Sequence, residues 1–350
     1  MSWPGIVAHY RPYLNLDPQA APVTLLEGNT PLIPAPRLAA EIAPGAELYL
    51  KYEGLNPTGS FKDRGMTAAI TQAAHAGARV TICASTGNTA ASAAAYSARA
   101  GLRCVVLVPE GKVAAGKIAG ALAYGAEVIA VQGSFDDALA LVREISQRRP
   151  IALVNSINPY RLEGQKTSAF EICDALGRAP DWLCLPVGNA GNISAYWLGF
   201  KQYHAAGQVA ARPKLLGVQA AGAAPLVVGH AIDRPETIAT AIRIGRPARG
   251  EEALAAAEES HGRIIAVSDD EILAMWYRLA HEGVWVEPAS AAGVAGLANE
   301  VRAGQIDPNG RCLVAVVTGH GLKDPGAVTE RAPQLRTIAA DIGVLEELMG

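Results

Sequence analysis

The stretch "NPTGSFKDRGM", residues 56–66, places a lysine among residues that form turns. Its asparagine, proline and glycine predict a turn. Ser60 followed three positions later by Asp63 has the spacing of a capping box at a helix start. The apolar positions after it predict a helix that ends near Gly77. We therefore expect Lys62 in the first turn of that helix.

Lys62 has two interpretations. The helix dipole is positive in a first turn, and together with partial burial and the nearby Arg64 it would lower the pKa of Lys62. A neutral amine is what forming an imine with an aldehyde requires. The alternative is a solvated lysine that the fold tolerates.

The segment "GNAGN", residues 188–192, stands between a strand-like and a helix-like segment. Backbone N–H groups exposed at a helix start form a cradle for an anion such as phosphate. The segment does not fit G-x-G-x-x-G, so it does not indicate a dinucleotide. The alternative is a tight turn that uses Gly and Asn for their tolerance of unusual backbone angles.

The segment "STGNTA", residues 85–90, offers hydroxyl and amide groups at another helix start. Such groups could hold a carboxylate, or Ser85, Thr86 or Asn88 could simply cap the helix. A third segment, "EGKVAAGKIAG" at residues 110–120, begins like a phosphate-binding P-loop but has Ile118 where Ser or Thr must reach Mg²⁺. We interpret it as a loop followed by a helical turn.

The elements that would position these loops alternate between strand-like and helix-like segments. Apolar strands separated by helices are typical of a parallel sheet covered on both faces, and in such sheets ligands bind at the carboxyl ends of the strands. We predict a two-domain α/β fold with a small domain at residues 80–155 and a large, discontinuous one at 1–79 and 156–350. The predicted strands lie within 80–85, 104–110, 127–133, 151–157, 182–188, 214–220 and 312–321.

Two further segments bear on the site. Residues 229–262 could cover it or form an ordinary surface excursion, and residues 268–283 read as a capped helix.

Composition and charge narrow the class of protein. A net charge of −3 and a pI near 6.2 in 350 residues give no basic footprint for nucleic acid. We find no apolar run of about 18 residues and no signal-peptide pattern at the start of the sequence. The five cysteines are odd in number and far apart, which predicts free thiols in a reducing cytoplasm and neither a disulfide frame nor a metal site.

An amine, a phosphate cradle and a carboxylate clasp on one α/β scaffold suggest pyridoxal phosphate with an amino-acid substrate. The chain also resembles the fold-type-II pyridoxal-phosphate enzymes (tryptophan-synthase-β-like), and among them the threonine synthases of the short bacterial type. The resemblance covers most of the chain, and "GNAGN" together with "TGHGLKD" is its most specific part. The matching segments are "LLEGNTPLIPAPRL", "LKYEGLNPTGSFKDRGM", "ASTGNTAASAAAYSARAG", "NSINPYRLEGQKT", "PVGNAGNISAYWLGF", "ATAIRIG", "VEPASAAGVAGL" and "VVTGHGLKDP".

The resemblance implies a role for each matching position. Lys62 would be the catalytic residue and carry the Schiff base, Asn88 would bind the ring 3′-oxygen, and Thr318 would bind the pyridine nitrogen. Glu287 and His320 would lie near the site without an assigned role. The cofactor phosphate would be bound by Gly188, Asn189, Ala190, Gly191 and Asn192, and the substrate by Ser85, Thr86, Asn88, Thr89, Asn155, Ser156 and Arg161.

The implied enzyme is a carbon–oxygen lyase of threonine biosynthesis that acts on a phosphate. O-phospho-L-homoserine and water would give L-threonine and phosphate, in a homodimer. Three alternatives stay open. A threonine or serine dehydratase shares the fold but usually has a tetraglycine phosphate loop, a non-catalytic relative would bind a phosphorylated ligand, and a nucleotide-binding enzyme would use residues 110–120.

Overall fold

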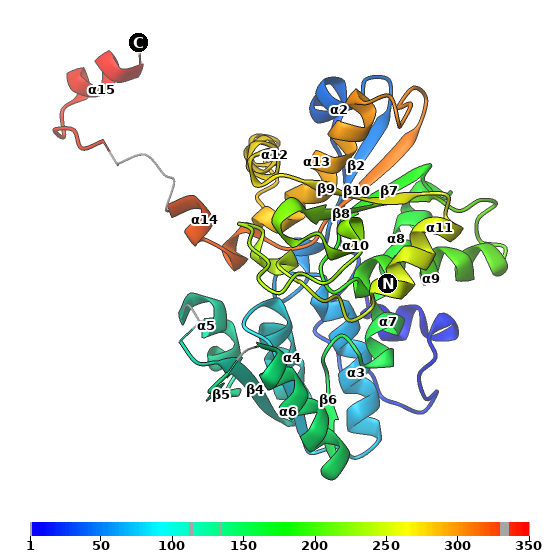
Figure 1. Cartoon of the computed structure of the whole chain (residues 1–350). Coiled ribbons are helices and arrows are strands. Elements are labelled where there is room, and N and C mark those ends of the chain that lie inside the picture. Colours follow the sequence, from blue (N-terminus) through cyan, green and yellow to red (C-terminus); the bar gives the residue numbers. More distant parts are fainter. Residues whose placement is uncertain (1, 112–114, 134, 330–335, 350) are drawn as a thin grey trace.

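The computed structural model of the chain describes residues 2–111, 115–133, 135–329 and 336–349. The strands in these ranges form two sheets, and helices pack on the faces of both (Figure 1). The sheets are parallel apart from one strand pair. The predicted α/β class with parallel-rich sheets is therefore confirmed.

The larger sheet has the strand order β1-β2-β10-β7-β8-β9 within the described ranges. Strand β1 is antiparallel to β2, and all other neighbours are parallel. The central strand β10, "CLVAVV", is buried along its whole length, as a continuous apolar run in a covered parallel sheet should be. The strands are β1 Leu32–Pro34, β2 Glu47–Tyr52, β7 Trp182–Pro186, β8 Lys214–Ala220, β9 Arg263–Val267 and β10 Cys312–Val317.

The smaller sheet has the order β5-β4-β3-β6 and is entirely parallel. All its strands fall inside the four segments predicted for residues 80–157, apart from one extra residue at the start of β4. They are β3 Val80–Ala84, β4 Arg103–Pro109, β5 Glu127–Val131 and β6 Ile151–Leu153.

The helices connect these strands and cover them. The predicted capped helix is confirmed as α12, where Ser268 and Glu271 form a reciprocal capping box. The α-helices are α1 Ile6–His9, α2 Pro36–Ile42, α3 Lys62–His75, α4 Asn88–Arg99, α5 Ala115–Ala123, α6 Phe135–Arg148, α7 Pro159–Gln165, α8 Thr167–Leu176, α9 Gly191–Ala205, α10 Pro225–Val228, α11 Gly250–Glu259, α12 Asp269–His281, α13 Pro288–Arg302, α14 Gly326–Thr329 and α15 Ile342–Met349. Short 3₁₀ turns lie at Arg11–Tyr13, Glu53–Leu55, Ala221–Ala223, Thr240–Ile242 and Gly321–Lys323.

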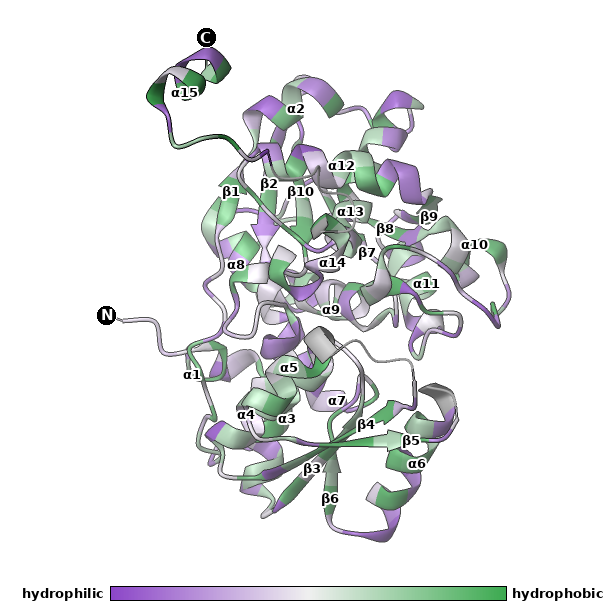
Figure 2. Cartoon of the chain, turned by 90° about the vertical axis from the view of Figure 1, so that its left-hand side faces the viewer, coloured by the Kyte–Doolittle hydropathy of each residue, from purple (hydrophilic) through white to green (hydrophobic). Residues whose placement is uncertain are grey.

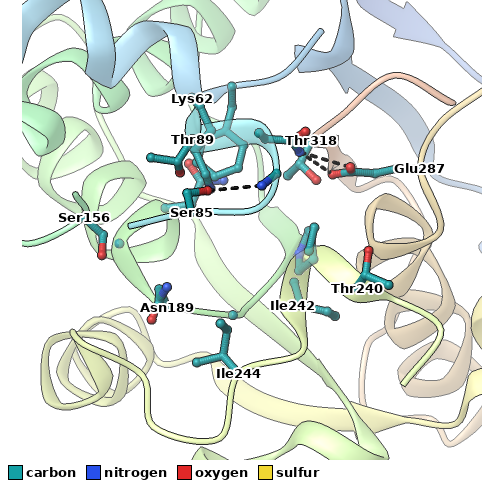
Figure 3. A pocket seen from close by; sticks show the side chains of 18 of the residues that line it. Lys62, Ser85, Thr89, Ser156, Asn189, Thr240, Ile242, Ile244, Glu287 and Thr318 are labelled. Carbon is teal, nitrogen blue, oxygen red and sulfur yellow. Dashed lines mark hydrogen bonds between the residues drawn. The ribbon is translucent and has the colours of Figure 1, made fainter. Parts of the chain in front are cut away.

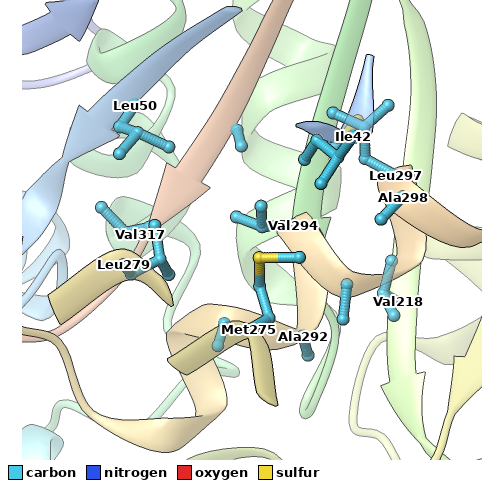
Figure 4. Close-up of a cluster of buried hydrophobic side chains, with 14 of the residues drawn as sticks. Ile42, Leu50, Val218, Met275, Leu279, Ala292, Val294, Leu297, Ala298 and Val317 are labelled. Carbon is cyan, nitrogen blue, oxygen red and sulfur yellow. The ribbon is translucent and has the colours of Figure 1, made fainter. Parts of the chain in front are cut away.

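Each sheet buries apolar side chains on both faces. On one face of the larger sheet, Met275 and Leu279 of α12 and Val294 of α13 pack with Val317 of β10 (Figure 4). A second cluster contains residues of α8 and α9 on the other face. These layers fix the ends of the central strands, and the loops after those ends form the site described below.

Helix α3 packs with the smaller sheet. Its residues Met66 and Ile70 belong to the same buried cluster as Cys83 of β3 and Val106 of β4, and α3 lies beside that sheet in Figure 1. The domain boundaries predicted from the sequence stay a prediction. This packing favours grouping α3 with the small domain, although the sequence placed it in the large one.

Apolar residues concentrate on the strands and on the helix sides that face them (Figure 2). Helix α15 near the C-terminus lies away from the two sheets (Figures 1 and 2). Over the described ranges, no helix has the length and apolarity that crossing a bilayer requires.

Candidate active site

A cavity of about 340 Å³ is lined by loops that follow strands of both sheets (Figure 3). The loops after β3 and β6 of the smaller sheet and after β7 and β10 of the larger sheet follow the carboxyl ends of parallel strands, and both pairs of loops line this cavity. The start of α3 and the residue before α13 also contribute to the wall.

Every site residue predicted from the sequence lines this one cavity. The structure thus brings together four loops that are separated by up to about two thirds of the chain. The predicted residues on its wall are Lys62, Ser85, Thr86, Asn88, Thr89, Asn155, Ser156, Arg161, Gly188, Asn189, Ala190, Gly191, Asn192 and Thr318.

Lys62 is the first residue of α3 and is partly buried. The Phe61 N–H donates to the Thr318 carbonyl oxygen at 3.1 Å, which ties the helix start to the end of β10. Burial and, to a smaller extent, the charge of Arg161 lower the pKa of Lys62 to about 7, against the opposing effect of the Glu287 carboxylate. The predicted low pKa of Lys62 is confirmed in direction.

The prediction that Arg64 lowers the pKa of Lys62 is wrong, since burial and Arg161 are what lower it. The Arg64 guanidinium is buried on the far side of α3, where Nε lies 2.6 Å from Glu53 Oε2 and Nη2 lies 2.6 Å from Glu171 Oε2. Lys51 Nζ lies 2.7 Å from the same Glu171 oxygen. Two carboxylates therefore balance two cations, and Arg64 anchors the helix that presents Lys62 to the cavity.

The predicted capping box at Ser60 and Asp63 is also wrong. Phe61 is the N-cap of α3, and no side chain caps the helix. The Asp63 carboxylate instead accepts hydrogen bonds from the Thr58 N–H and hydroxyl and from the Ser92 hydroxyl, each at 2.6 Å. Asp63 thereby links the turn before Lys62 to α4, which carries the neighbouring loop.

The loop after β3 keeps its polar side chains out of helix capping. Gly87 is the N-cap of α4 and no side chain caps that end, so the capping alternative for Ser85, Thr86 and Asn88 is wrong. Asn88 Nδ2 donates to the two Glu287 carboxylate oxygens at 3.2 and 3.0 Å (Figure 3). This contact joins the start of α4 to the start of α13 across the cavity.

The loop after β7 has features of a tight turn and also features that suit an anion-binding cradle. Ala190 has a positive φ of 65° and is the N-cap of α9, so the turn is tight. Asn192 Nδ2 is buried without a hydrogen-bond partner among the described residues. Because buried polar groups are almost always paired, an unpaired amide beside a helix N-terminus fits an anionic ligand.

Arg161 is buried, which excludes the alternative of a surface ion pair. Its side chain is 1% exposed, Nη1 donates to the Val154 carbonyl oxygen at 2.8 Å, and Nε has no partner in the described part of the chain. Burial lowers the pKa of Arg161 to about 10. A buried guanidinium with a free donor at a cavity wall is suited to binding an anion.

Two glycines bring Arg161 and Lys62 to the same cavity. Helices α3 and α7 cross so closely that a Cβ at Gly164 would lie 1.8 Å from the Arg64 carbonyl oxygen. A Cβ at Gly65 would lie 2.5 Å from Arg161 Nε. The small residues therefore permit the approach of the two helices.

Asn155 and Ser156 hold the loop after β6 in place. The Asn155 amide exchanges hydrogen bonds with the backbone of Ala84, from N–H to Oδ1 at 3.0 Å and from Nδ2 to the carbonyl oxygen at 2.9 Å. The Ser156 carbonyl accepts from Arg249 Nε at 3.1 Å. Arg249 thus links this loop to the segment before α11.

The two residues predicted near the site have different places. Glu287 lines the cavity, and burial raises the pKa of its carboxyl group. His320 is not part of the lining and stacks on Tyr52 with ring centroids 6.1 Å apart.

Sequence reasoning missed part of the cavity wall. Residues of the segment before α11 line it, so part of 229–262 does cover the site. The motifs "ATAIRIG" and "TGHGLKDP" contain several of these residues and could have pointed to them. The missed residues in the two motifs do not form a pattern that by itself indicates a binding or catalytic role. The lining residues that were not predicted are Phe61, Ala84, Gly87, Gly120, Gln165, Pro186, Val187, Ile193, Thr240, Ala241, Ile242, Arg243, Ile244, Leu322 and Lys323.

The P-loop-like stretch is only partly described. Residues 112–114 lie outside the described ranges, and α5 begins at Ala115. Ile118, at the position where a P-loop needs a hydroxyl group, packs against the apolar cluster of the smaller sheet.

Comparison with known proteins agrees with this geometry. Residues 23–319 match the family model described as pyridoxal-phosphate dependent enzyme. The chain is 57% identical to threonine synthase of Synechocystis sp. over 99% of this chain and 91% of that protein. It is 54% identical to threonine synthase of Mycobacterium leprae over 99% of this chain and 96% of that protein.

A solved structure shares the fold. Threonine deaminase isoform 2 of Solanum lycopersicum superimposes with a TM-score of 0.74 at 25% identity, over 87% of this chain and 84% of that one. The matched family region includes Lys62 and every other predicted site residue. The chain therefore belongs to the pyridoxal-phosphate-dependent enzyme family.

Proposed function

We propose that this chain is a threonine synthase that converts O-phospho-L-homoserine and water to L-threonine and phosphate. The near-full-length identity to two threonine synthases supports this activity. One observation on the cavity carries the proposal. Lys62 lines the same cavity as Asn192 and Arg161, and in the described part of the chain the buried donors Asn192 Nδ2 and Arg161 Nε have no hydrogen-bond partner. The cofactor phosphate would bind at Asn192, and the substrate phosphate would bind at Arg161.

The residues present fit pyridoxal phosphate. The loop of residues 188–192 and the N-terminus of α9 would hold its phosphate, because Asn192 offers an unused amide there. Thr318 would face the ring nitrogen, and Asn88, held by Glu287, would face the 3′-oxygen. When bound, the cofactor supplies an electron-accepting ring that stabilises negative charge on carbon atoms of an attached amino acid.

Lys62 would hold the cofactor covalently and move protons at Cα and Cβ of the substrate. Its pKa of about 7 keeps much of the amine neutral at neutral pH, as a base requires. Ser85, Thr86 and Thr89, together with Asn88, would bind the substrate carboxylate with hydroxyl and amide groups that no helix cap uses.

The substrate phosphate would lie against Arg161 and the loop that contains Asn155 and Ser156. Arg161 lines the cavity, its buried Nε has no hydrogen-bond partner among the described residues, and Asn155 holds the loop through the Ala84 backbone. After Cβ loses its proton and the γ-phosphate departs, phosphate held by Arg161 would stay near Cβ, where water adds.

The assay that tests this function measures products from O-phospho-L-homoserine. We expect one phosphate for each threonine and little ammonia. A dehydratase would instead release ammonia and a keto acid from threonine or serine, and the tomato threonine deaminase shares the fold. Ammonia as the main product would support that alternative, and no turnover of either substrate would support a non-catalytic relative.

Replacing Arg161 with glutamine is expected to raise KM for O-phospho-L-homoserine about 10- to 100-fold, because a charge-assisted hydrogen bond to phosphate is lost. Part of the turnover should divert to 2-oxobutyrate, since departed phosphate no longer stays near Cβ. Steady-state kinetics with product analysis measures both.

Arg161→Lys is the matched variant, because it keeps the charge and loses the planar fork. We expect it to fall between wild type and Arg161→Gln. If both variants keep the wild-type KM and product ratio, Arg161 does not bind the substrate.

We further propose that the enzyme is a cytoplasmic homodimer, as its resemblance to the family implies. The five cysteines are buried free thiols, which a reducing compartment maintains. Sedimentation equilibrium would give the mass of the assembly, to be compared with 36.3 kDa for one chain.

A further inference from the structure

Ser290 lies behind the cavity wall in the first turn of α13 and is fully buried. Its hydroxyl oxygen accepts the backbone N–H of Thr318 and that of Gly319, both at 2.9 Å. A serine hydroxyl has two acceptor lone pairs and one hydrogen. Both lone pairs of Ser290 are therefore used by donors that cannot reverse direction.

The single hydrogen of Ser290 must then be donated. Among the residues that the structure describes, two acceptors lie within reach, Thr318 Oγ1 at 3.0 Å and the Gly319 carbonyl oxygen at 3.4 Å. Thr318 Oγ1 is the nearer one, and the Gly319 carbonyl already accepts the Glu287 N–H at 3.0 Å. The geometry favours donation from Ser290 to Thr318.

We propose that Ser290 is a positioning residue that makes the Thr318 hydroxyl a hydrogen-bond donor toward the cavity. When Thr318 Oγ1 accepts from Ser290, its own hydrogen is directed elsewhere, and the group placed there must be an acceptor. This inference rests on the proposed function, in which the ring nitrogen of the cofactor faces Thr318.

The test compares two ligands that cannot react with Lys62. Pyridoxine phosphate has an alcohol in place of the aldehyde, and its 1-deaza analogue also has C–H in place of the ring nitrogen. Titration of the cofactor-free protein gives the affinity ratio of the two. We expect wild type to prefer pyridoxine phosphate by about tenfold or more, because the analogue leaves the Thr318 donor unpaired.

In Ser290→Ala the ratio should fall to about twofold, because the Thr318 hydroxyl can then turn to another acceptor. Ser290→Cys, with a weak donor and acceptor of similar size, should give an intermediate ratio and serves if the alanine variant folds poorly. The matched control is Ser97→Ala, since Ser97 is equally buried and bonds Thr81 Oγ1 at 2.7 Å. It should keep the wild-type ratio.

The outcomes separate this inference from the proposed function. A strong wild-type preference that both Ser290 variants retain would overturn the inference and assign the Ser290 hydrogen to Gly319. Equal binding of the two ligands by wild type would show that Thr318 does not donate to the ring nitrogen, and would overturn it as well. If wild type binds neither ligand, the cofactor site itself is wrong.

Discussion

The Lys62→Ala variant is expected to lose threonine synthase activity by at least about 10³-fold, because the change removes both the covalent attachment and the base. Lys62 is the cavity amine whose pKa burial lowers to about 7. The other cations on the wall, Arg161, Arg243 and Lys323, cannot replace it at the start of α3. Steady-state phosphate and threonine release measures the loss.

Borohydride reduction followed by peptide mapping provides the independent readout. In wild type the pyridoxyl label should be found on the peptide that contains Lys62, and in Lys62→Ala no labelled peptide should appear. Lys323→Ala is the matched control, since Lys323 lines the same cavity and donates to the Thr58 carbonyl at 3.1 Å. An active, coloured Lys62→Ala protein would refute the assigned role.

The pH dependence of cofactor capture follows from the same amine. Only neutral Lys62 reacts with an aldehyde, and its pKa is about 7. The rate at which cofactor-free protein captures pyridoxal phosphate should therefore rise between about pH 6 and 8 and then level off. A lysine near its ordinary pKa of about 10.4 would give a rate that still rises above pH 9, and stopped-flow absorbance distinguishes the two profiles.

Arg161 supplies a check on the cause of that profile. The charge of Arg161 contributes to the low pKa of Lys62, so Arg161→Gln should move the rise to higher pH. Arg64→Met should not move it in the same way, because Arg64 is neutralised by Glu53 and Glu171 on the far side of α3.

The sequence predicted the site loops well, because their functional residues directly follow strands that have a clear apolar pattern. The loops after β3, β7 and β10 could be predicted because apolar runs mark the strands and because parallel strands end at one edge. Strands β1, β2 and β9 were not predicted. Strand β1 has three residues and includes Pro34, and β9 is only half-buried over most of its length, so neither has a strong pattern.

The errors concern partners that are far apart in the sequence. Arg64 bonds Glu53 and Glu171, which lie 11 and 107 positions away, so its neutralisation cannot be read from the residues beside Lys62. The Asp63 carboxylate is taken by Thr58 and Ser92, and this tertiary contact replaces the expected cap. Local sequence patterns thus placed Lys62 correctly at the start of its helix, but they gave the wrong roles for the neighbouring Asp63 and Arg64.

The largest effect on stability is expected for Arg64→Met. All three nitrogens of Arg64 donate to acidic or hydroxyl side chains, and its removal leaves Glu53 and Glu171 facing Lys51 alone in a buried site. An uncompensated buried charge costs about 3–5 kcal/mol. Denaturation by urea, followed by circular dichroism, should show this decrease in the free energy of unfolding.

Arg246→Met is the matched control, because Arg246 pairs with Asp233 at 2.6 Å in an exposed position. An exposed pair contributes at most about 1 kcal/mol, so this variant should stay near wild type. Adding Glu171→Gln to Arg64→Met should recover part of the loss, since it removes the excess negative charge and neighbouring substitutions are not additive. Equal losses for Arg64→Met and Arg246→Met, with no recovery in the double variant, would mean that the charge cluster does not anchor α3.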